Sequence, residues 1–372
     1  MVAGGAVVAR AWTQGVFSVG QGPAYEPWKT WRADRPEGPA RLVRSAILAA
    51  NPHNSQPWLF RVGNASIDVF ADTARNIGTI DPYRREMYMG VGCALENLLL
   101  AAQRYGYSAS VVLLPDAGNP AHAARVALTP APAADSELFE AIPARHTDRG
   151  AYDRARPVLP ETLATLAGLG PDLPEVGVFW FTTEPDRRRV GELIVAAAKA
   201  IIADHQQSSD SAKWFRSSWR EIQELRDGTT LDAQSLPAFI DVMAKILPPP
   251  SQEQGDQAWL EATRERHVAT AAAFGLLVVP DARDNVWRIR GGRLWQRMHL
   301  WATTQGLSMQ PLNQMSERAD RERMLSIEPR FGGALKQLVA TPGLEALMPF
   351  RLGYPMTKAR ASPRRDVTAV LV

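Results

Sequence analysis

Two stretches of the chain, 200 residues apart, follow the same pattern, and this repetition limits the folds that the chain can adopt. The first is GCALENLLLAAQRYGYS (92–108) and the second is GRLWQRMHLWATTQGLS (292–308). They share five identical residues in 17 positions, and each predicts an apolar helix that stops at a glycine. The pattern indicates an internal duplication of a half-chain unit, although a helix with a glycine stop is common enough to recur by chance.

The length and composition are those of a folded protein with two domains. The chain has 372 residues, and domains commonly hold about 100–200 residues. With 45% hydrophobic and 22% charged residues, most of the chain cannot be disordered. The net charge of +3 is too small for a polybasic nucleic-acid binder. One cysteine, Cys93, excludes an intramolecular disulfide and a cysteine-based zinc cluster.

Hydrophobic periodicity predicts helices and strands on both sides of a Pro/Ala linker at 129–136. Helices are expected at 41–50, 87–105, 160–169, from 185 onward and at 291–305. Strands are expected at 58–62, 66–70, 108–115, 125–130, 176–183 and 276–280. An extended arm is expected at 13–40 and a loop at 306–314. Residues 206–257 are polar and end in a proline-rich stretch, which predicts an inserted helical segment that covers a site, here called the lid.

The first nine residues, Met1–Ala9, are apolar but too few to span a membrane, which takes about twenty. They lack the basic region of a signal peptide. We expect either a surface-packed terminus or the tail of an export or anchor segment. No other apolar run reaches membrane length, so we expect no membrane span and a cytoplasmic protein, with export or anchoring as the alternative.

The segment NPHNSQPW (51–58) concentrates short polar side chains between a predicted helix and a predicted strand. Amide and hydroxyl groups at such a junction can hydrogen-bond the edge of a heteroaromatic ring and a polyol tail. The candidate binding residues are His53, Asn54, Ser55 and Gln56. A polar turn that caps its own backbone is the alternative.

A second polar segment, RHTDR (145–149), follows the linker. Arg145, Thr147 and Arg149 alternate, so an extended backbone places all three on one face. Two guanidinium groups beside a hydroxyl form a phosphate cradle. A solvated basic loop is the alternative. His146 is expected on the opposite face, in a packing role.

Further arginines lie near the C-terminus, in PFRLGYPMTKARASPRRDV (349–367). Arg360, Arg364 and Arg365 are candidate phosphate contacts, with a plain basic tail as the alternative. The sequence has no HExxH spacing, no GxSxG elbow and no GxxxxGK[ST] loop. No metal ligands and no catalytic nucleophile are therefore assigned.

Together these segments resemble the FMN-dependent nitroreductase superfamily. NSQPW (54–58) resembles its flavin-contacting element, and RHTDRGAYDRARPV (145–158) resembles its phosphate-binding element. LMPFRLGYP (347–355) followed by PRR is similar to its closing strand and last phosphate arginine. GLSMQPLNQ (306–314) lies where the family has the loop that passes the flavin N5 edge. NPHNSQPW with a downstream RHTDR is similar in particular to the Acg-like branch, over about residues 13–372.

The resemblance implies an α+β fold, a nitroreductase-like three-layer α-β-α arrangement built from two fused half-units, an intramolecular pseudo-dimer. The halves are expected at 13–130 and 140–372, with the lid inserted at about 206–257. NSQPW occurs only in the first half and RHTDR only in the second. The resemblance therefore implies one composite site, one FMN per chain and a monomer.

The resemblance also implies a reaction and its partners: hydride passes from NAD(P)H through flavin N5 to an oxidised acceptor, such as a nitroaromatic or a quinone. Arg145, Thr147, Arg149 and Arg364 or Arg365 would hold the phosphate, and residues 53–56 the ribityl chain and one ring edge. The N5 environment would come from Met309, Gln310, Pro311, Leu312 and Asn313. No side-chain acid or base is required. The alternatives are a flavin-binding or sequestering protein without turnover, occluded by the lid, and an α/β domain whose basic tail binds nucleic acid, which the small net charge disfavours.

Overall fold

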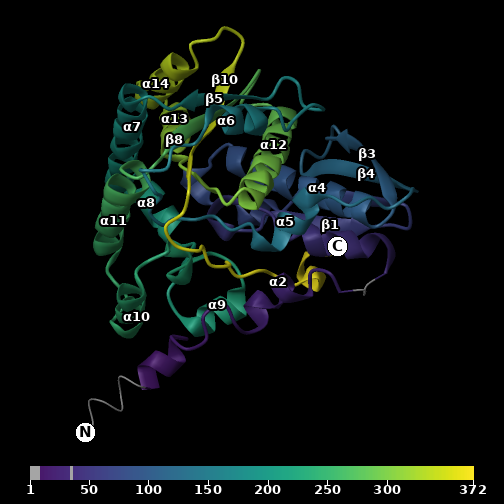
Figure 1. Cartoon of the computed structure of the whole chain (residues 1–372), viewed down its shortest axis with the longest axis horizontal. Helices are drawn as coiled ribbons and strands as arrows, with labels where there is room; N and C mark the ends of the chain where they lie inside the picture. The colour runs from purple at the N-terminus through teal and green to yellow at the C-terminus, as the bar shows by residue number, and fades with distance from the viewer. Residues whose placement is uncertain (1–8, 34–36) are drawn as a thin grey trace.

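The computed structural model describes residues 9–33 and 37–372, which form two four-stranded antiparallel sheets with helices packed on them (Figure 1). The first sheet has the order β1 (Trp58–Val62), β2 (Ser66–Ala71), β4 (His122–Pro130), β3 (Tyr107–Leu113). The second has the order β5 (Gly177–Phe181), β8 (Ala273–Val279), β10 (Glu345–Gly353), β9 (Ser308–Pro311). Both sheets have the same topology. In each sheet, the strand that comes third along the chain (β3 or β9) lies at the edge, next to the strand that comes fourth (β4 or β10). The expected α+β class is confirmed.

Two long helices, α4 (Arg85–Arg104) and α12 (Asn285–Thr304), form the centre of the molecule. Helix α4 packs on the first sheet, α12 packs on the second, and the two helices pack on each other. A Cβ atom on Gly92 would overlap the carbonyl oxygen of Ile289, and one on Gly292 would overlap that of Met89. The helices can approach this closely because glycine has no side chain.

A further layer of helices covers the other face of the second sheet. It consists of α7 (Glu184–Ala203), α13 (Gln314–Leu325) and α14 (Arg330–Val339). Ile194, Phe274 and Phe331 are buried in the core between these helices and the sheet. Helix α7 begins where the Thr183 hydroxyl accepts a hydrogen bond from the backbone N–H of Asp186. The second sheet thus lies between two helical layers.

The lid and its borders are helical. They contain α8 (His205–Ala212), α9 (Trp219–Leu225), α10 (Ala238–Ile246), α11 (Gln252–Glu261) and a short parallel pair, β6 (Phe215–Arg216) and β7 (Thr229–Thr230). Helix α11 continues into a π-helical segment, Ala262–Val268. Figure 1 shows these helices along one side of the molecule, and α9 contacts the N-terminal turn Pro23–Tyr25 next to α2 (Glu26–Thr30). The lid therefore connects the second half to the beginning of the first.

The C-terminal tail, residues 354–372, runs back from the second sheet to the first (Figure 1, yellow). Pro355 forms a bridge with Tyr152, and Leu371 forms a parallel bridge with Phe60 on β1. The tail therefore carries its arginines from the second half toward the turn before β1.

Several sequence-based expectations were wrong in detail. Residues 306–314 are not a loop throughout, because 308–311 form β9 against β10. Strand β9 lies at the edge of its sheet, where a proline such as Pro311 is tolerated. Helix α12 begins at Asn285 instead of 291, because the Asp284 carboxylate caps it through Val286 N at 2.8 Å. The expected helix at 41–50 is α3 (Leu42–Ala46), and 13–40 contains short helices instead of an extended arm.

The expectation for the N-terminal end concerns residues 1–9, of which residues 1–8 lie outside the described residues. None of the helices in the described part of the chain is both long and apolar enough to cross a membrane.

Candidate functional site

The turn between α3 and β1 has a strained backbone. Three of four successive residues are left-handed: His53 (φ 48°), Asn54 (φ 54°) and Gln56 (φ 52°). The Asn51 side chain holds the turn by accepting a hydrogen bond from Gln56 N at 2.7 Å. Left-handed backbone is rare for residues other than glycine, and it occurs most often at functional sites.

Two buried arginines lie next to this turn, and we call them the arginine pair. Arg145 is 2% exposed and Arg364 is 3% exposed. Arg145 Nη2 donates to the carbonyl of Leu48 at 3.1 Å, and Arg364 Nη2 donates to that of Ala49 at 3.2 Å. Within the described residues, no carboxylate forms an ion pair with either guanidinium. The pair therefore rests on adjacent backbone carbonyls without a counter-charge.

The arginine pair is electrostatically unfavourable as it stands. Burial lowers the pKa of Arg145 to about 10. Burial, together with the charge of Arg145, lowers the pKa of Arg364 well below its usual value. The Nε atoms of both side chains are buried without a hydrogen-bond partner. Because buried charges are costly unless they are paired, this arrangement is suited to binding an anion.

Two imidazoles border the arginine pair without adding charge to it. Burial lowers the pKa of His146 to about 3, and its ring lies edge-on to Trp28 with centroids 4.7 Å apart. Burial also holds the pKa of His299 well below its usual value. His299 Nδ1 lies 3.4 Å from Arg145 Nη1, so the neutral ring can accept a hydrogen bond from the guanidinium.

The rest of the RHTDR segment turns toward the lid. Arg149 Nη1 donates to the carbonyl of Ala233 in the lid at 3.2 Å. Thr147, which lies between Arg145 and Arg149 in the sequence, is half-buried. The charge of Arg149 adds to burial in lowering the pKa of His53 to about 4. His53 in turn lies within hydrogen-bond distance of the lid, with Nε2 3.0 Å from Ser211 Oγ.

The other candidate arginines of the tail are engaged elsewhere. Arg365 Nη1 lies 3.7 Å from a carboxylate oxygen of Asp72. Arg360 Nη1 donates to Asp232 of the lid at 3.0 Å and to a second lid carboxylate at the same distance. Of the three C-terminal arginines, Arg364 is the one placed beside RHTDR.

The segment expected near flavin N5 is packed into the second half. Met309 and Leu312 are fully buried, Gln310 Oε1 accepts from Arg351 Nε at 2.7 Å, and Pro311 pairs with β10. The buried Oδ1 atom of Asn313 has no hydrogen-bond partner. Among the described residues, no hydrogen bond of 309–313 reaches the arginine pair.

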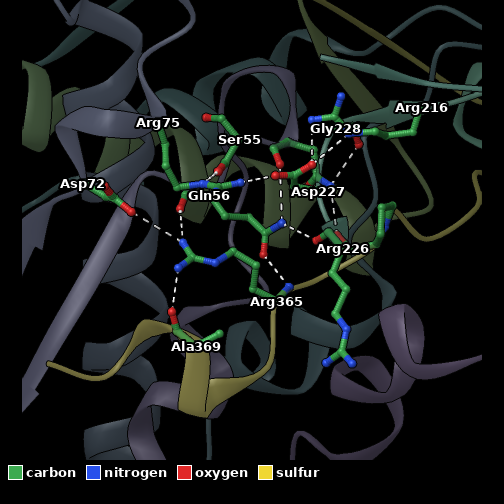
Figure 2. A network of polar contacts seen from close by, with 12 residues as sticks. Ser55, Gln56, Asp72, Arg75, Arg216, Arg226, Asp227, Gly228, Arg365 and Ala369 are labelled. Carbon is green, nitrogen blue, oxygen red and sulfur yellow. Dashed lines mark hydrogen bonds and ion pairs between the residues drawn. The ribbon is translucent and has the colours of Figure 1, made fainter. Parts of the chain in front are cut away.

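The amide side chains of Asn54 and Gln56 are bound by the lid. Asn54 Nδ2 donates to the carbonyl of Gly228 at 3.0 Å, and Gln56 Nε2 donates to that of Arg226 at 2.8 Å. Gln56 Oε1 accepts from the backbone N–H of Arg365 at 2.8 Å, so the turn, the lid and the tail meet at this amide (Figure 2).

An ion-pair network holds this part of the lid in place. Figure 2 shows Asp227 between Arg75, which comes from the first half, and Arg216, which comes from the lid. Arg216 Nε donates to Asp227 at 2.9 Å, and Arg75 also bonds to the backbone carbonyl of Ser55. The lid is therefore fastened to the strained turn by a buried carboxylate.

These residues fit a phosphate-bearing group at the arginine pair, and residues 226–228 accept hydrogen bonds from the neighbouring amides of Asn54 and Gln56. Arg145 Nε, Arg364 Nε and Ser55 Oγ are buried polar atoms without a protein partner, and a bound ligand would provide one. Within the described residues, no group of three or more His, Cys, Asp or Glu side chains is placed to hold a metal ion. An anionic ligand is the chemistry that this geometry favours.

Sequence reasoning missed two neighbours of the arginine pair. His299 lies in the middle of α12, 154 residues from Arg145, and no local motif marks it. Lys358 adds its positive charge to the surroundings of His146. Its position two residues before Arg360 in a basic tail was the signal that could have indicated it.

Comparisons with known proteins cover part of the chain. No family model matches it. A protein of Mycobacterium tuberculosis named "Putative NAD(P)H nitroreductase Rv3131" is 36% identical over 113 residues, which are 30% of this chain and 33% of that protein. "Putative NAD(P)H nitroreductase acg" of the same organism is 32% identical over 89 residues, 24% of this chain and 27% of that protein. The chain spans about a third of the length of the curated relatives it matches. Within that span, the resemblance to Acg-like nitroreductases is confirmed.

Solved structures of nitroreductases align over more of the chain. The FMN-dependent nitroreductase NfnB of Mycobacterium smegmatis, in complex with NADPH, covers 63% of this chain and 96% of its own at 16% identity and a TM-score of 0.38. A Bacteroides fragilis nitroreductase with bound FMN covers 62% and 95% at 14% identity and a TM-score of 0.35. Scores this low support no conclusion about this chain.

Proposed function

We propose that the protein is an FMN-dependent oxidoreductase that accepts hydride from NAD(P)H and reduces an oxidised acceptor such as a nitroaromatic or a quinone. The observation that carries the proposal is the arginine pair, buried beside a strained NSQPW turn with no carboxylate partner among the described residues. The names of the partly matching relatives support the same reaction class.

In this proposal each residue has a defined task. Arg145 and Arg364 hold the cofactor phosphate through charge-assisted hydrogen bonds, and His299 together with the Leu48 carbonyl fixes the Arg145 guanidinium. The unpartnered hydroxyl of Ser55 binds the polyol chain next to the phosphate, and the Asn54 amide positions Arg364 by accepting a hydrogen bond from its Nη1. When bound, FMN supplies the hydride-carrying chemistry. The chain supplies binding, orientation and exclusion of water, and no side chain is assigned as an acid or base.

A second candidate function is flavin binding without turnover. The lid favours it, because Asn54 and Gln56 donate to the carbonyls of Gly228 and Arg226 while Asp227 pairs with two arginines. A lid held this firmly would keep a nicotinamide from reaching the flavin.

One experiment separates the two functions. The purified protein is examined for a flavin absorbance spectrum and is then mixed with NADPH without oxygen. Bleaching of the flavin supports the oxidoreductase, and a persistent oxidised spectrum supports the binder. A protein that takes up no FMN at all would contradict both.

We further propose that the chain is a pseudo-dimer of fused halves, with one composite site and one FMN per chain. The common strand order of the two sheets and the reciprocal contacts Gly92–Ile289 and Gly292–Met89 support this arrangement. Because both halves are already present in one chain, light scattering should report a monomer. An obligate dimer would contradict the proposal.

A further inference from the structure

A long groove lies on the outer helices of the second half. Its residues belong neither to the arginine pair nor to the strained turn at 53–56. It has a volume of about 740 Å³ and runs along α7, the π-helical segment and the beginning of α14. Figure 1 shows α7 and α14 together at one edge of the molecule. Its floor consists of small apolar side chains, namely Val195, Ala196, Ala200 and Val268, all half-buried.

The rim of the groove is positively charged. It carries Arg188, Lys199, Arg264 and Arg330 and one carboxylate, Glu192. Because the helix rises about 1.5 Å per residue, Arg188 and Lys199 stand about 16 Å apart along α7. The groove is therefore elongated, apolar at its base and cationic along its edges.

These cations are free to bind a ligand. Among the described residues, neither Lys199 nor Arg264 forms a hydrogen bond or an ion pair through its side chain, and both are exposed. Arg330 contacts a ring instead of a carboxylate, with its guanidinium 5.0 Å from the centroid of Phe331. By contrast, the half-buried Arg187 of the same helix pairs with Glu184 at 2.6 Å.

We propose that this groove binds the anion of a long-chain fatty acid. An apolar floor favours an alkyl chain, and unpaired ammonium and guanidinium groups on the rim favour a carboxylate head. The open groove, with a volume of about 740 Å³, has room for one extended alkyl chain along its floor. An acidic amphipathic peptide would match the charge, but the volume favours the smaller ligand.

The two elements that form the floor of the groove are packed tightly against each other. A Cβ atom on Gly191 would overlap the side chain of Val268, so α7 and the π-helical segment are in close contact there. π-helical turns are uncommon and occur frequently at functional sites. Here the segment contributes Arg264 and Val268 to the groove, while its His267 is buried on the inner side.

The test is palmitate binding to the full chain, measured by calorimetry below the concentration at which palmitate forms micelles. Palmitate should bind with micromolar affinity, octanoate more weakly by about threefold or more per methylene lost from the site, and hexadecanol at least tenfold more weakly than palmitate. The double variant Lys199→Glu/Arg264→Glu should lose at least tenfold in affinity. Arg61→Glu, which reverses an exposed charge on β1, should bind palmitate like the unmodified protein.

Two further variants keep the proposal falsifiable. Ala196→Trp fills the floor of the groove and should abolish binding without changing the charge. Arg145→Ala/Arg364→Ala removes the arginine pair and should leave palmitate binding unchanged, which separates this site from the proposed flavin site. Undetectable binding of palmitate, equal binding to the charge-reversed variant, or binding of an acidic helical peptide in place of palmitate would each overturn the proposal.

Discussion

Two buried clusters of like charge in this molecule are balanced in opposite ways. The arginine pair has no carboxylate partner in the described structure. A second cluster, the acidic cluster, consists of Asp81, Glu86, Glu317 and Asp320, all at most 7% exposed. It surrounds Arg85, whose Nε donates to Asp320 at 3.0 Å and whose Nη2 donates to Glu86 at 3.2 Å. The acidic cluster thus has a cation of the chain, Arg85, as its partner, whereas the arginine pair has no anion of the described residues as a partner.

The difference follows from what each side chain can do with a proton. Burial raises the pKa of Glu317 to about 7, and those of Asp81 and Glu86 also lie above their usual values. Carboxylates can therefore lose their charge by protonation, but a guanidinium stays charged near neutral pH. A buried acidic cluster can be structural, whereas an unpaired buried basic cluster indicates an anionic ligand.

The largest expected effect comes from removing the arginine pair. Arg145→Ala/Arg364→Ala should give a folded, colourless protein, because hydrogen bonds to charged groups contribute about 1.5–3 kcal/mol each. FMN affinity should fall by at least a hundredfold, measured by flavin absorbance after dialysis. Arg365→Ala is the matched control, since Arg365 already pairs with Asp72, and it should keep its flavin. Full FMN content in the double variant would show that the arginine pair does not bind the cofactor phosphate.

Removing the counter-charge of the acidic cluster should cost stability. Arg85→Met should lower the free energy of unfolding by about 3–4 kcal/mol, because it leaves buried carboxylates without a partner. Urea unfolding at pH 7.5 measures the loss, and lowering the pH should recover part of it. The control is Arg323→Met, which removes a half-exposed cation 3.8 Å from Asp320 and should cost under about 0.5 kcal/mol. Equal losses in the two variants would show that burial does not matter.

The acidic cluster should also impose a pH dependence on stability. The pKa of Glu317 in the folded state, about 7, lies above the usual glutamate value of 4.5, so between these values the folded state binds more protons. Stability should therefore fall as the pH rises from about 4.5 to about 7. Glu317→Gln should reduce this fall by about 1–2 kcal/mol, measured by urea unfolding at pH 5 and pH 8. An unchanged pH profile in the variant would assign the dependence to other groups.

The smallest effect is expected at the neutral partner of the arginine pair. His299→Leu removes the acceptor 3.4 Å from Arg145 and should weaken FMN binding by about fivefold, corresponding to one modest hydrogen bond of about 1 kcal/mol. His299→Gln restores an acceptor and should recover most of the affinity. Fluorescence titration with FMN measures both. Stronger binding in His299→Leu would show that the imidazole opposes the anion.

Local patterns in the sequence predicted the regular elements well and the long-range contacts poorly. Strand β1 was expected at 58–62 and is found there, because a short apolar run ends at a Gly-Asn turn. The sequence did not decide whether Arg364 or Arg365 contacts the phosphate, because the direction of each side chain depends on how the tail turns. The acidic cluster was not predicted at all, because its members are spread from residue 81 to residue 320. Only the folded chain brings the beginning of α4 beside α13, where Arg85 donates to Asp320.

The two reciprocal glycine contacts have a consequence for how this molecule can change. In a symmetric dimer, one substitution at such a contact alters both copies at once. Here Gly92 and Gly292 belong to one chain, so each can be substituted alone while the other contact stays intact. One mutation would disrupt two helix contacts in a symmetric dimer, but it disrupts one helix contact in this chain. The two contacts can therefore change independently of each other.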